Sequence, residues 1–297
     1  MIIKAVTDDL AEFKYRFGII TKGLNSMIKR TISALIMLAM LFAVLYVHYF
    51  MNIDIINYAV AVLTVMALYE IYKPYGFTKH KIIAFFGFAL SMFIIFGDIE
   101  NGAYTLAVMS AFVIILLSLT VLFHTRFTFR DVSVILMSTL YISFGMSSLR
   151  LLLEGDRGFY LFFAVLIGAV MTDAGGYFVG SICGKHKLIE KISPKKTVEG
   201  AIGGIVFALV SYAVYDVIID FVFPAGTNWL VLMITGLVAS VGAQFGDLTA
   251  SMIKREIGIK DYGNIIPGHG GIMDRIDSIL FVAPIIYYSN VLFGIII

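Results

Sequence analysis

One stretch decides the fold class of this chain: WLVLMITGLVASVGAQFGDLTA, residues 229–250. It is about as long as the roughly 20 residues that a helix needs to cross a bilayer, and Asp247 is its one charged residue. Charge, glycine and histidine then gather over residues 246–277 more densely than anywhere else in the chain. The pattern predicts a membrane helix with a polar cluster at the membrane edge.

The composition agrees with an integral membrane protein. Hydrophobic residues make up 60% of the chain and charged residues 14%, and the mean hydropathy is +0.95. A soluble domain of this length has a far more polar mix. Lys and Arg number 22 against 20 Asp and Glu, so the bulk charge predicts no nucleic-acid partner. The single cysteine, Cys183, excludes an internal disulfide and is interpreted as a packing residue.

Other apolar runs of spanning length are separated by short polar breaks. We therefore expect an all-α, polytopic membrane protein with about nine transmembrane helices. We divide it into N-terminal transmembrane helices (31–158) and a C-terminal transmembrane catalytic region (159–297), preceded by residues 1–30. The predicted spans are residues 31–51, 53–72, 81–98, 102–123, 132–150, 159–182, 200–222, 229–250 and 276–296.

Residues 1–30 are too polar for the bilayer core, yet apolar residues recur in them at helical spacing. This favours a cytoplasmic amphipathic helix that lies on the membrane surface, and a mobile tail is the alternative. The apolar positions are Leu10, Phe13, Phe17, Ile20 and Leu24.

Positive residues predict the orientation. With the N-terminus inside, 20 of the 22 Lys and Arg fall in cytoplasmic segments, and Arg150 and Arg157 alone fall outside. This asymmetry predicts a cell (inner) membrane protein whose polar loops face the cytoplasm.

The first unusual cytoplasmic loop follows Asp173, an ionisable residue deep in an apolar run. Placing an ionisable side chain in the bilayer core costs free energy unless it faces a partner or a water-filled cavity. We therefore predict a functional role for Asp173. Gly176, Gly180 and Gly184 follow at helical spacing, where close helix packing is an equal explanation.

Lys195, Lys196 and Thr197 directly precede a span that begins with glycines. A helix N-terminus beside two ammonium groups attracts phosphate. The alternatives are that the lysines set topology or touch lipid head groups, and that Thr197 caps the helix.

The second unusual loop is the polar cluster itself. If the helix continues past residue 250, Asp247, Ser251, Lys254 and Arg255 share one face, as do Asp274 and Asp277 at the start of the last span. Three converging carboxylates beside several cations suit a magnesium–nucleotide site. Ion pairing for structure alone is the alternative.

His269 lies among glycines in this loop. Gly270 and Gly271 let the backbone approach a ligand closely. His269 itself is predicted to contact phosphate, exchange protons or cap a turn.

This loop resembles the signature of the phosphatidate cytidylyltransferases, also called CDP-diacylglycerol synthases. The match is long and fixed in spacing. It covers Ser251, Ile253, Lys254, Arg255, Lys260, Asp261, Gly263, Ile266, Pro267, His269, Gly270, Gly271, Ile272, Asp274, Arg275, Ile276 and Asp277, with Gly246–Leu248 and Ser193–Gly200 upstream.

The resemblance implies a reaction of CTP with phosphatidate of the inner leaflet to give CDP-diacylglycerol and pyrophosphate. It further implies a Mg²⁺ requirement, contacts with membrane lipids and a homodimer. Asp247, Asp274 and Asp277 would be the metal ligands. The surrounding catalytic residues would be Ser251, Lys254, Arg255, Lys260, Asp261 and His269, and the substrate-binding residues Asp173, Lys195, Lys196, Thr197, Glu199, Gly270, Gly271 and Arg275.

The chain departs from the family pattern at one place. The family commonly has Asp-Thr-Gly-Ala-Tyr where this chain has Asp173–Tyr177, DAGGY, and a base where this chain has Ser181. Two other functions stay open: a CTP-dependent enzyme acting on an ether lipid or a polyprenol, and an ion-coupled transporter that uses Asp173 and Asp247.

Overall fold

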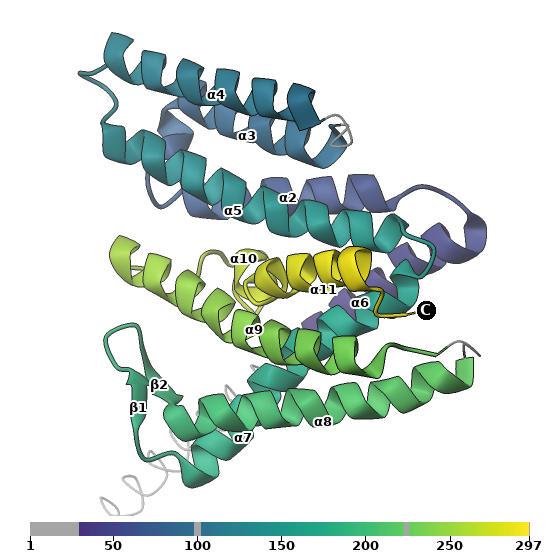
Figure 1. The fold of residues 1–297 in the computed structure, drawn as a ribbon. Helices are drawn as coiled ribbons and strands as arrows, with labels where there is room; N and C mark the ends of the chain where they lie inside the picture. The colour runs from purple at the N-terminus through teal and green to yellow at the C-terminus, as the bar shows by residue number, and fades with distance from the viewer. Residues whose placement is uncertain (1–29, 98–101, 223–225, 297) are drawn as a thin grey trace, which may run out of the picture.

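The computed structural model describes residues 30–97, 102–222 and 226–296. Of the predicted surface-lying segment 1–30, all but Arg30 lies outside the described residues. The described chain is all-α apart from one two-stranded antiparallel hairpin that the sequence did not predict (Figure 1).

The helices follow the apolar runs closely. They are Arg30–Met51, α2 (Ile56–Tyr72), α3 (Lys81–Phe96), α4 (Gly102–Leu122), α5 (Phe129–Glu154), α6 (Gly158–Leu166), η2 (Ile167–Met171), α7 (Thr172–Cys183), α8 (Val198–Val222), α9 (Trp229–Ile257), α10 (Met273–Ile276) and α11 (Ile279–Phe293), with a short turn η1 (Phe77–Lys79). The hairpin pairs β1 (Lys187–Ile189) with β2 (Ser193–Thr197) between α7 and α8.

Six helical segments in the described part are long and apolar enough to cross a membrane: 30–51, 104–122, 129–154, 158–183, 198–222 and 229–257. Three further predicted spans correspond to α2, α3 and α11, which have 17, 16 and 15 residues. These are shorter than the roughly 20 residues that a straight span needs. The predicted count of nine spans is therefore not confirmed.

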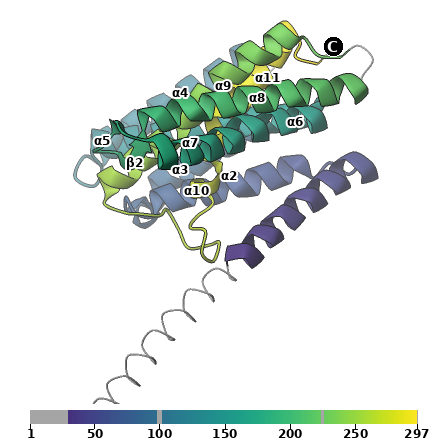
Figure 2. The same cartoon turned by 90° about the horizontal axis from the view of Figure 1, so that it is seen from below.

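The helices cross the molecule in alternating directions. In Figure 1, the hairpin, the α4–α5 connection and the C-terminal end of α9 lie at the left edge, and the C-terminus lies at the right. Figure 2 shows the helix Arg30–Met51 slanting away from the others beside the loop before α10. The polar loops thus share one end of the bundle.

Close helix packing joins α7 to α8. A Cβ at Gly203 would overlap the Val179 side chain, and one at Gly204 would lie 2.6 Å from the Thr172 carbonyl oxygen. Small residues at such positions let two helix backbones approach. A π-helical segment, η2, precedes α7 and shifts its helical phase.

Tyr212 of α8 anchors the centre of the bundle. It is fully buried, and its hydroxyl donates to the Ala164 carbonyl oxygen at 2.8 Å. Gly168 and Gly236 make the space for its ring. This packing fixes α8 against η2 and α9, which together carry part of the site.

Candidate active site

A cavity of about 400 Å³ lies where α7, β2, α8 and α9 meet. Its walls include Asp173 from α7, Lys195, Lys196 and Thr197 from β2, and Asp247 from α9. The structure therefore brings the two unusual loops of the sequence together in one hollow.

An ion pair crosses this cavity. Lys196 Nζ lies 2.5 Å from Asp247 Oδ2, and the two side chains are about one quarter exposed. On the other oxygen, the Ser251 hydroxyl donates to Asp247 Oδ1 at 3.4 Å. Because α9 continues to Ile257, Asp247 and Ser251 lie one turn apart on the same face, as the spacing predicted.

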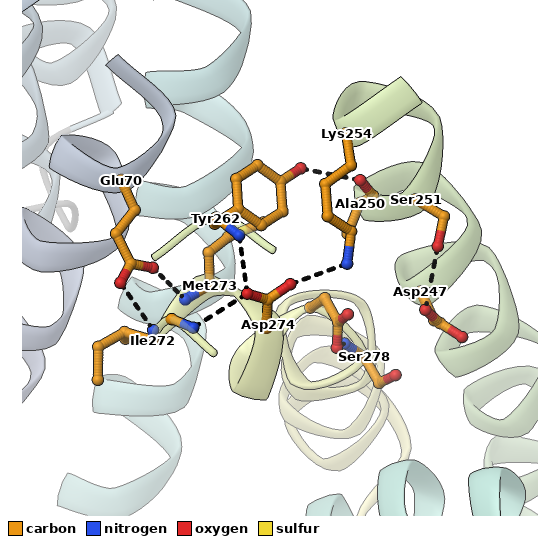
Figure 3. Close-up of polar contacts among 12 residues, drawn as sticks. Glu70, Asp247, Ala250, Ser251, Lys254, Tyr262, Ile272, Met273, Asp274 and Ser278 are labelled. Atoms are coloured by element: carbon orange, nitrogen blue, oxygen red, sulfur yellow. Dashed lines mark hydrogen bonds and ion pairs between the residues drawn. The ribbon is translucent and has the colours of Figure 1, made fainter. Parts of the chain in front are cut away.

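Asp274 is the centre of a second polar cluster (Figure 3). Its Oδ1 accepts from Lys254 Nζ at 2.8 Å, and its Oδ2 accepts the backbone N–H groups of Tyr262 at 2.9 Å and Gly271 at 3.0 Å. The Asp274 side chain is only 5% exposed. This carboxylate therefore ties the end of α9 to the loop before α10.

Tyr262 belongs to the same cluster, and Lys254 Nζ lies over its ring. Its hydroxyl donates to the Ala250 carbonyl oxygen at 2.9 Å, and its ring centroid lies 5.4 Å from Lys254 Nζ. Burial raises the pKa of Tyr262 above its usual range, so the hydroxyl stays protonated and remains a donor.

Further acids gather around Ser278. The Ser278 N–H donates to Asp277 Oδ1 at 2.8 Å, and its hydroxyl donates to Asp173 Oδ2 at 3.5 Å. The charges of Asp173 and Asp247 both repel that of Asp277. Carboxylates from α7, α9 and the turn before α11 thus face one region, which Lys196 partly neutralises.

Asp247, Asp274 and Asp277 are the predicted metal ligands. Carboxylate oxygens are the donors that Mg²⁺ prefers, so the residue types fit. In the described part of the chain, however, no group of three or more His, Cys, Asp or Glu side chains is arranged to hold a metal ion. Asp247 and Asp274 each form an ion pair with a lysine.

Several other predicted residues support the hairpin. Thr197 caps α8 by accepting the Gly200 N–H at 3.1 Å. Glu199 accepts the backbone N–H groups of Lys185 and His186 and lies 2.6 Å from His186 Nδ1. Arg255 donates to the Ile192 carbonyl oxygen at 3.3 Å. Glu199 and Arg255 therefore contact the hairpin and are not among the cavity-lining residues.

His269 lies at the far tip of the loop, against the first described helix. Its Nδ1 is 2.8 Å from the Ser33 hydroxyl, which is also 2.9 Å from the Pro267 carbonyl oxygen. Gly268 and Gly270 on either side have φ of +78° and +82°, which explains their glycines. Lys260 and Asp261 are exposed on the loop, and Arg275 is exposed on α10.

Sequence reasoning missed three residues that organise the site: Glu70, Ser33 and Tyr262. Glu70 of α2 accepts the backbone N–H groups of Ile272 at 3.0 Å and Met273 at 2.9 Å. A signal for it existed, because Glu70 is an acid inside an apolar run, as is Asp173. Ser33 and Tyr262 carry no comparable signal.

Comparisons with known proteins agree on one family. The model of the cytidylyltransferase family matches residues 28–293. A phosphatidate cytidylyltransferase of Staphylococcus saprophyticus is 45% identical over 173 residues, which are 58% of this chain and 64% of that protein. One of Bacillus subtilis strain 168 is 42% identical over 184 residues, 61% of this chain and 66% of that protein. The aligned part thus spans less than two thirds of these relatives.

Proposed function

We propose that this chain, which belongs to the cytidylyltransferase family, is a membrane phosphatidate cytidylyltransferase that converts CTP and phosphatidate into CDP-diacylglycerol and pyrophosphate. The observation that carries the proposal is the cavity in which Lys195, the Lys196–Asp247 ion pair and the start of α8 meet. The names of the relatives in Staphylococcus saprophyticus and Bacillus subtilis support the choice of lipid.

The reaction joins two polyanions. A phosphomonoester oxygen of phosphatidate attacks the α-phosphorus of CTP, a new P–O bond forms, and the bond to the β-phosphate oxygen breaks to release pyrophosphate. The nucleophile is already anionic near neutral pH, so the site needs no strong general base. It needs positive charge and alignment.

Residues that line the cavity, together with Lys254 outside its lining, supply positive charge and alignment. Lys195 and Lys196 lie beside the N-terminus of α8, whose helix dipole favours a phosphate. Lys254 stands at the end of α9, within reach of Asp274. In the proposed complex these ammonium groups turn from the carboxylates to the substrate phosphates.

Mg²⁺ is part of the proposal. The residues that would hold it are Asp247, Asp274 and Asp277, once substrate phosphates draw the lysines away. Bound there, the ion would neutralise triphosphate charge and stabilise the leaving pyrophosphate. His269 and the exposed Lys260, Asp261 and Arg275 would border the nucleotide.

We place the protein in the cell membrane with these loops and the N-terminus in the cytoplasm, because the predicted topology of nine spans puts 20 of the 22 Lys and Arg on that side. CTP then reaches the cavity from the cytoplasm while the acyl chains of phosphatidate stay in the inner leaflet. The homodimer expected from the family resemblance remains a prediction, which cross-linking in membranes tests.

One assay tests the function. The purified protein in detergent receives CTP, Mg²⁺ and phosphatidate, and CDP-diacylglycerol and pyrophosphate are measured together. We expect equal amounts of both products and no product without CTP. An ether-linked phosphatidate and a polyprenyl phosphate are tested in parallel; preference for either over phosphatidate contradicts the lipid assignment. Ion-driven uptake into vesicles without CTP would instead indicate a transporter.

A further inference from the structure

Glu70 is a buried acid that the proposed reaction does not use directly. It lies in α2, its residue is 3% exposed, and its neighbours along the helix are apolar. A buried carboxylate is unfavourable unless its oxygens are satisfied. Within residues 30–97, 102–222 and 226–296, no basic side chain forms an ion pair with it.

Its oxygens instead bind the backbone of the loop that carries Asp274. Oε1 accepts the Ile272 N–H at 3.0 Å, and Oε2 accepts the Met273 N–H at 2.9 Å (Figure 3). Ile272 is the N-cap residue of α10 and Met273 its first residue, and the N-cap side chain makes no capping hydrogen bond. Glu70 therefore caps α10 from another helix, about 200 residues earlier in the chain.

Two carboxylates, Glu70 and Asp274, each accept two backbone N–H groups of this segment. Glu70 holds Ile272 and Met273, while Asp274 holds the N–H groups of Tyr262 and Gly271. The N–H groups of residues 271–273 are thus all bound to acids. Because Glu70 holds the backbone directly before Asp274, it helps to place the Asp274 carboxylate against Lys254.

The glycines of the loop give independent evidence. A Cβ built on Gly263 or Gly271 would overlap the Glu70 carboxylate. Neither glycine has a positive φ, so backbone conformation does not require glycine at these two positions. The close contact with the Glu70 carboxylate is what requires glycine at positions 263 and 271.

From these contacts we propose that Glu70 is a positioning residue of the nucleotidyl-transfer site, acting through the backbone of Ile272 and Met273 to align Asp274 and Asp277. The proposal rests on the proposed function. It assigns to α2 a direct part in the geometry of a site whose acids and bases come from the C-terminal region.

The chemistry of the contact requires two acceptors. The amide of Glu70→Gln offers one acceptor oxygen, and its NH₂ group faces the second N–H as donor against donor. The side chain of Glu70→Asp is one methylene shorter and does not reach both N–H groups. Glu70→Gln leaves the volume of the core nearly the same, so it acts on the hydrogen bonds, whereas Glu70→Asp also removes one buried methylene.

The test compares Glu70→Gln and Glu70→Asp with Thr64→Val. Thr64 is fully buried in the same helix, and its hydroxyl bonds the Val60 carbonyl oxygen of its own helix, so it is a matched control. With CTP and phosphatidate as substrates, we expect Glu70→Gln to lower kcat about 100-fold, since a small misplacement of a catalytic group has an effect of that order. The KM for phosphatidate should stay within about threefold, because Lys195 and Lys196 lie on another wall. Thr64→Val should keep the wild-type kcat.

Amide hydrogen exchange without substrates gives a second readout that does not depend on activity. In Glu70→Gln, exchange at Ile272 and Met273 should accelerate about tenfold or more, while exchange within α9 and the thermal midpoint stay as in the wild type. If the variant does not fold, Gly271→Ala and Gly263→Ala attack the same contact from the loop side and should give the same loss of kcat. Gly155→Ala, whose Cβ would make only ordinary contacts at the opposite end, is the control.

The outcomes separate the two proposals. A wild-type protein that forms no CDP-lipid contradicts the proposed function and, with it, the catalytic part of this inference, whereas the exchange data still decide whether Glu70 holds the loop. An active wild type with a Glu70→Gln variant of unchanged kcat overturns the positioning role. A loss of kcat with faster exchange throughout the protein also overturns it, since Glu70 would then serve stability alone.

Discussion

Asp247 and Asp274 each bind a lysine, Asp247 through Lys196 and Asp274 through Lys254. The two pairs differ in burial: the Asp274 side chain is 5% exposed and the Asp247 side chain is 28% exposed. Removing one member of a buried pair leaves an uncompensated charge, which costs about 3–5 kcal/mol. Asp274 is thus expected to matter for stability as well as for the reaction, and Asp247 mainly for the reaction.

The first prediction at this scale concerns these two acids. We expect Asp247→Asn and Asp274→Asn to lower Mg²⁺-dependent CDP-diacylglycerol formation at least about 100-fold, an effect typical for loss of a charged group that stabilises a transition state. Asp274→Asn should also lower the free energy of unfolding by about 3–5 kcal/mol, since the neutral Asn leaves Lys254 without its charge partner and cannot satisfy Tyr262, Gly271 and Lys254 together.

Turnover and thermal unfolding are measured on the same detergent preparations. Asp156→Asn, an exposed acid at the opposite end of the bundle, is the control and should match the wild type. Near-wild-type rates in both site variants would contradict the assignment of Asp247 and Asp274.

At the scale of elements, the α7–α8 pair builds most of the cavity. Gly176 and Gly180 of α7 line it, and α8 begins at its edge with Thr197 as the cap. The sequence left open whether the glycines serve packing or a ligand. The structure shows close packing, because a Cβ at Gly180 would lie 3.1 Å from the Thr197 hydroxyl and 3.4 Å from the Gly200 Cα.

We expect Gly204→Ala to destabilise the protein by about 1–3 kcal/mol, the usual range for overpacking. A Cβ at this position would lie 2.6 Å from the Thr172 carbonyl oxygen, so α8 must move away from α7. The measurement is thermal unfolding in detergent. Val210→Leu enlarges an exposed side chain of the same helix and is the control, which should change the midpoint little. A Gly204→Ala variant as stable as the wild type would contradict the prediction, because α7 and α8 could then move apart without loss of stability.

At the scale of the whole molecule, the two parts of the chain meet at the loop before α10. Helix Arg30–Met51 contacts it through Ser33, and α2 contacts it through Glu70, while the C-terminal region supplies Asp247 and Lys254. The division at residue 158 therefore does not separate the site from the N-terminal helices. All of these contacts lie at the end of the bundle that we assign to the cytoplasm.

The single cysteine tests that orientation directly. Cys183 is exposed at the end of α7, next to the hairpin. We expect a membrane-impermeant maleimide to label it in inverted vesicles and not in intact cells. Cys183→Ser combined with Asp156→Cys moves the thiol to the other end and should reverse the result. Labelling of Cys183 from outside the cell would contradict the orientation.

The sequence by itself determined the fold class and the residues of the polar loops. Hydropathy is a local property, so each apolar run became a helix, and Asp247 and Ser251 share a face because α9 continues to Ile257. For Thr197, the alternative that it caps a helix is confirmed. The predicted number of nine spans is not confirmed, because three of the runs form helices shorter than a straight span needs.

Only the tertiary structure decided which acid meets which base. Lys196 pairs with Asp247 and Lys254 with Asp274, whereas Arg255, on the same predicted wall, reaches the hairpin. Glu70 bonds Met273 across 203 positions of the chain, and no local pattern specifies a partner so distant. Periodicity places a side chain on a face, but the packing of helices against one another selects what that face contacts.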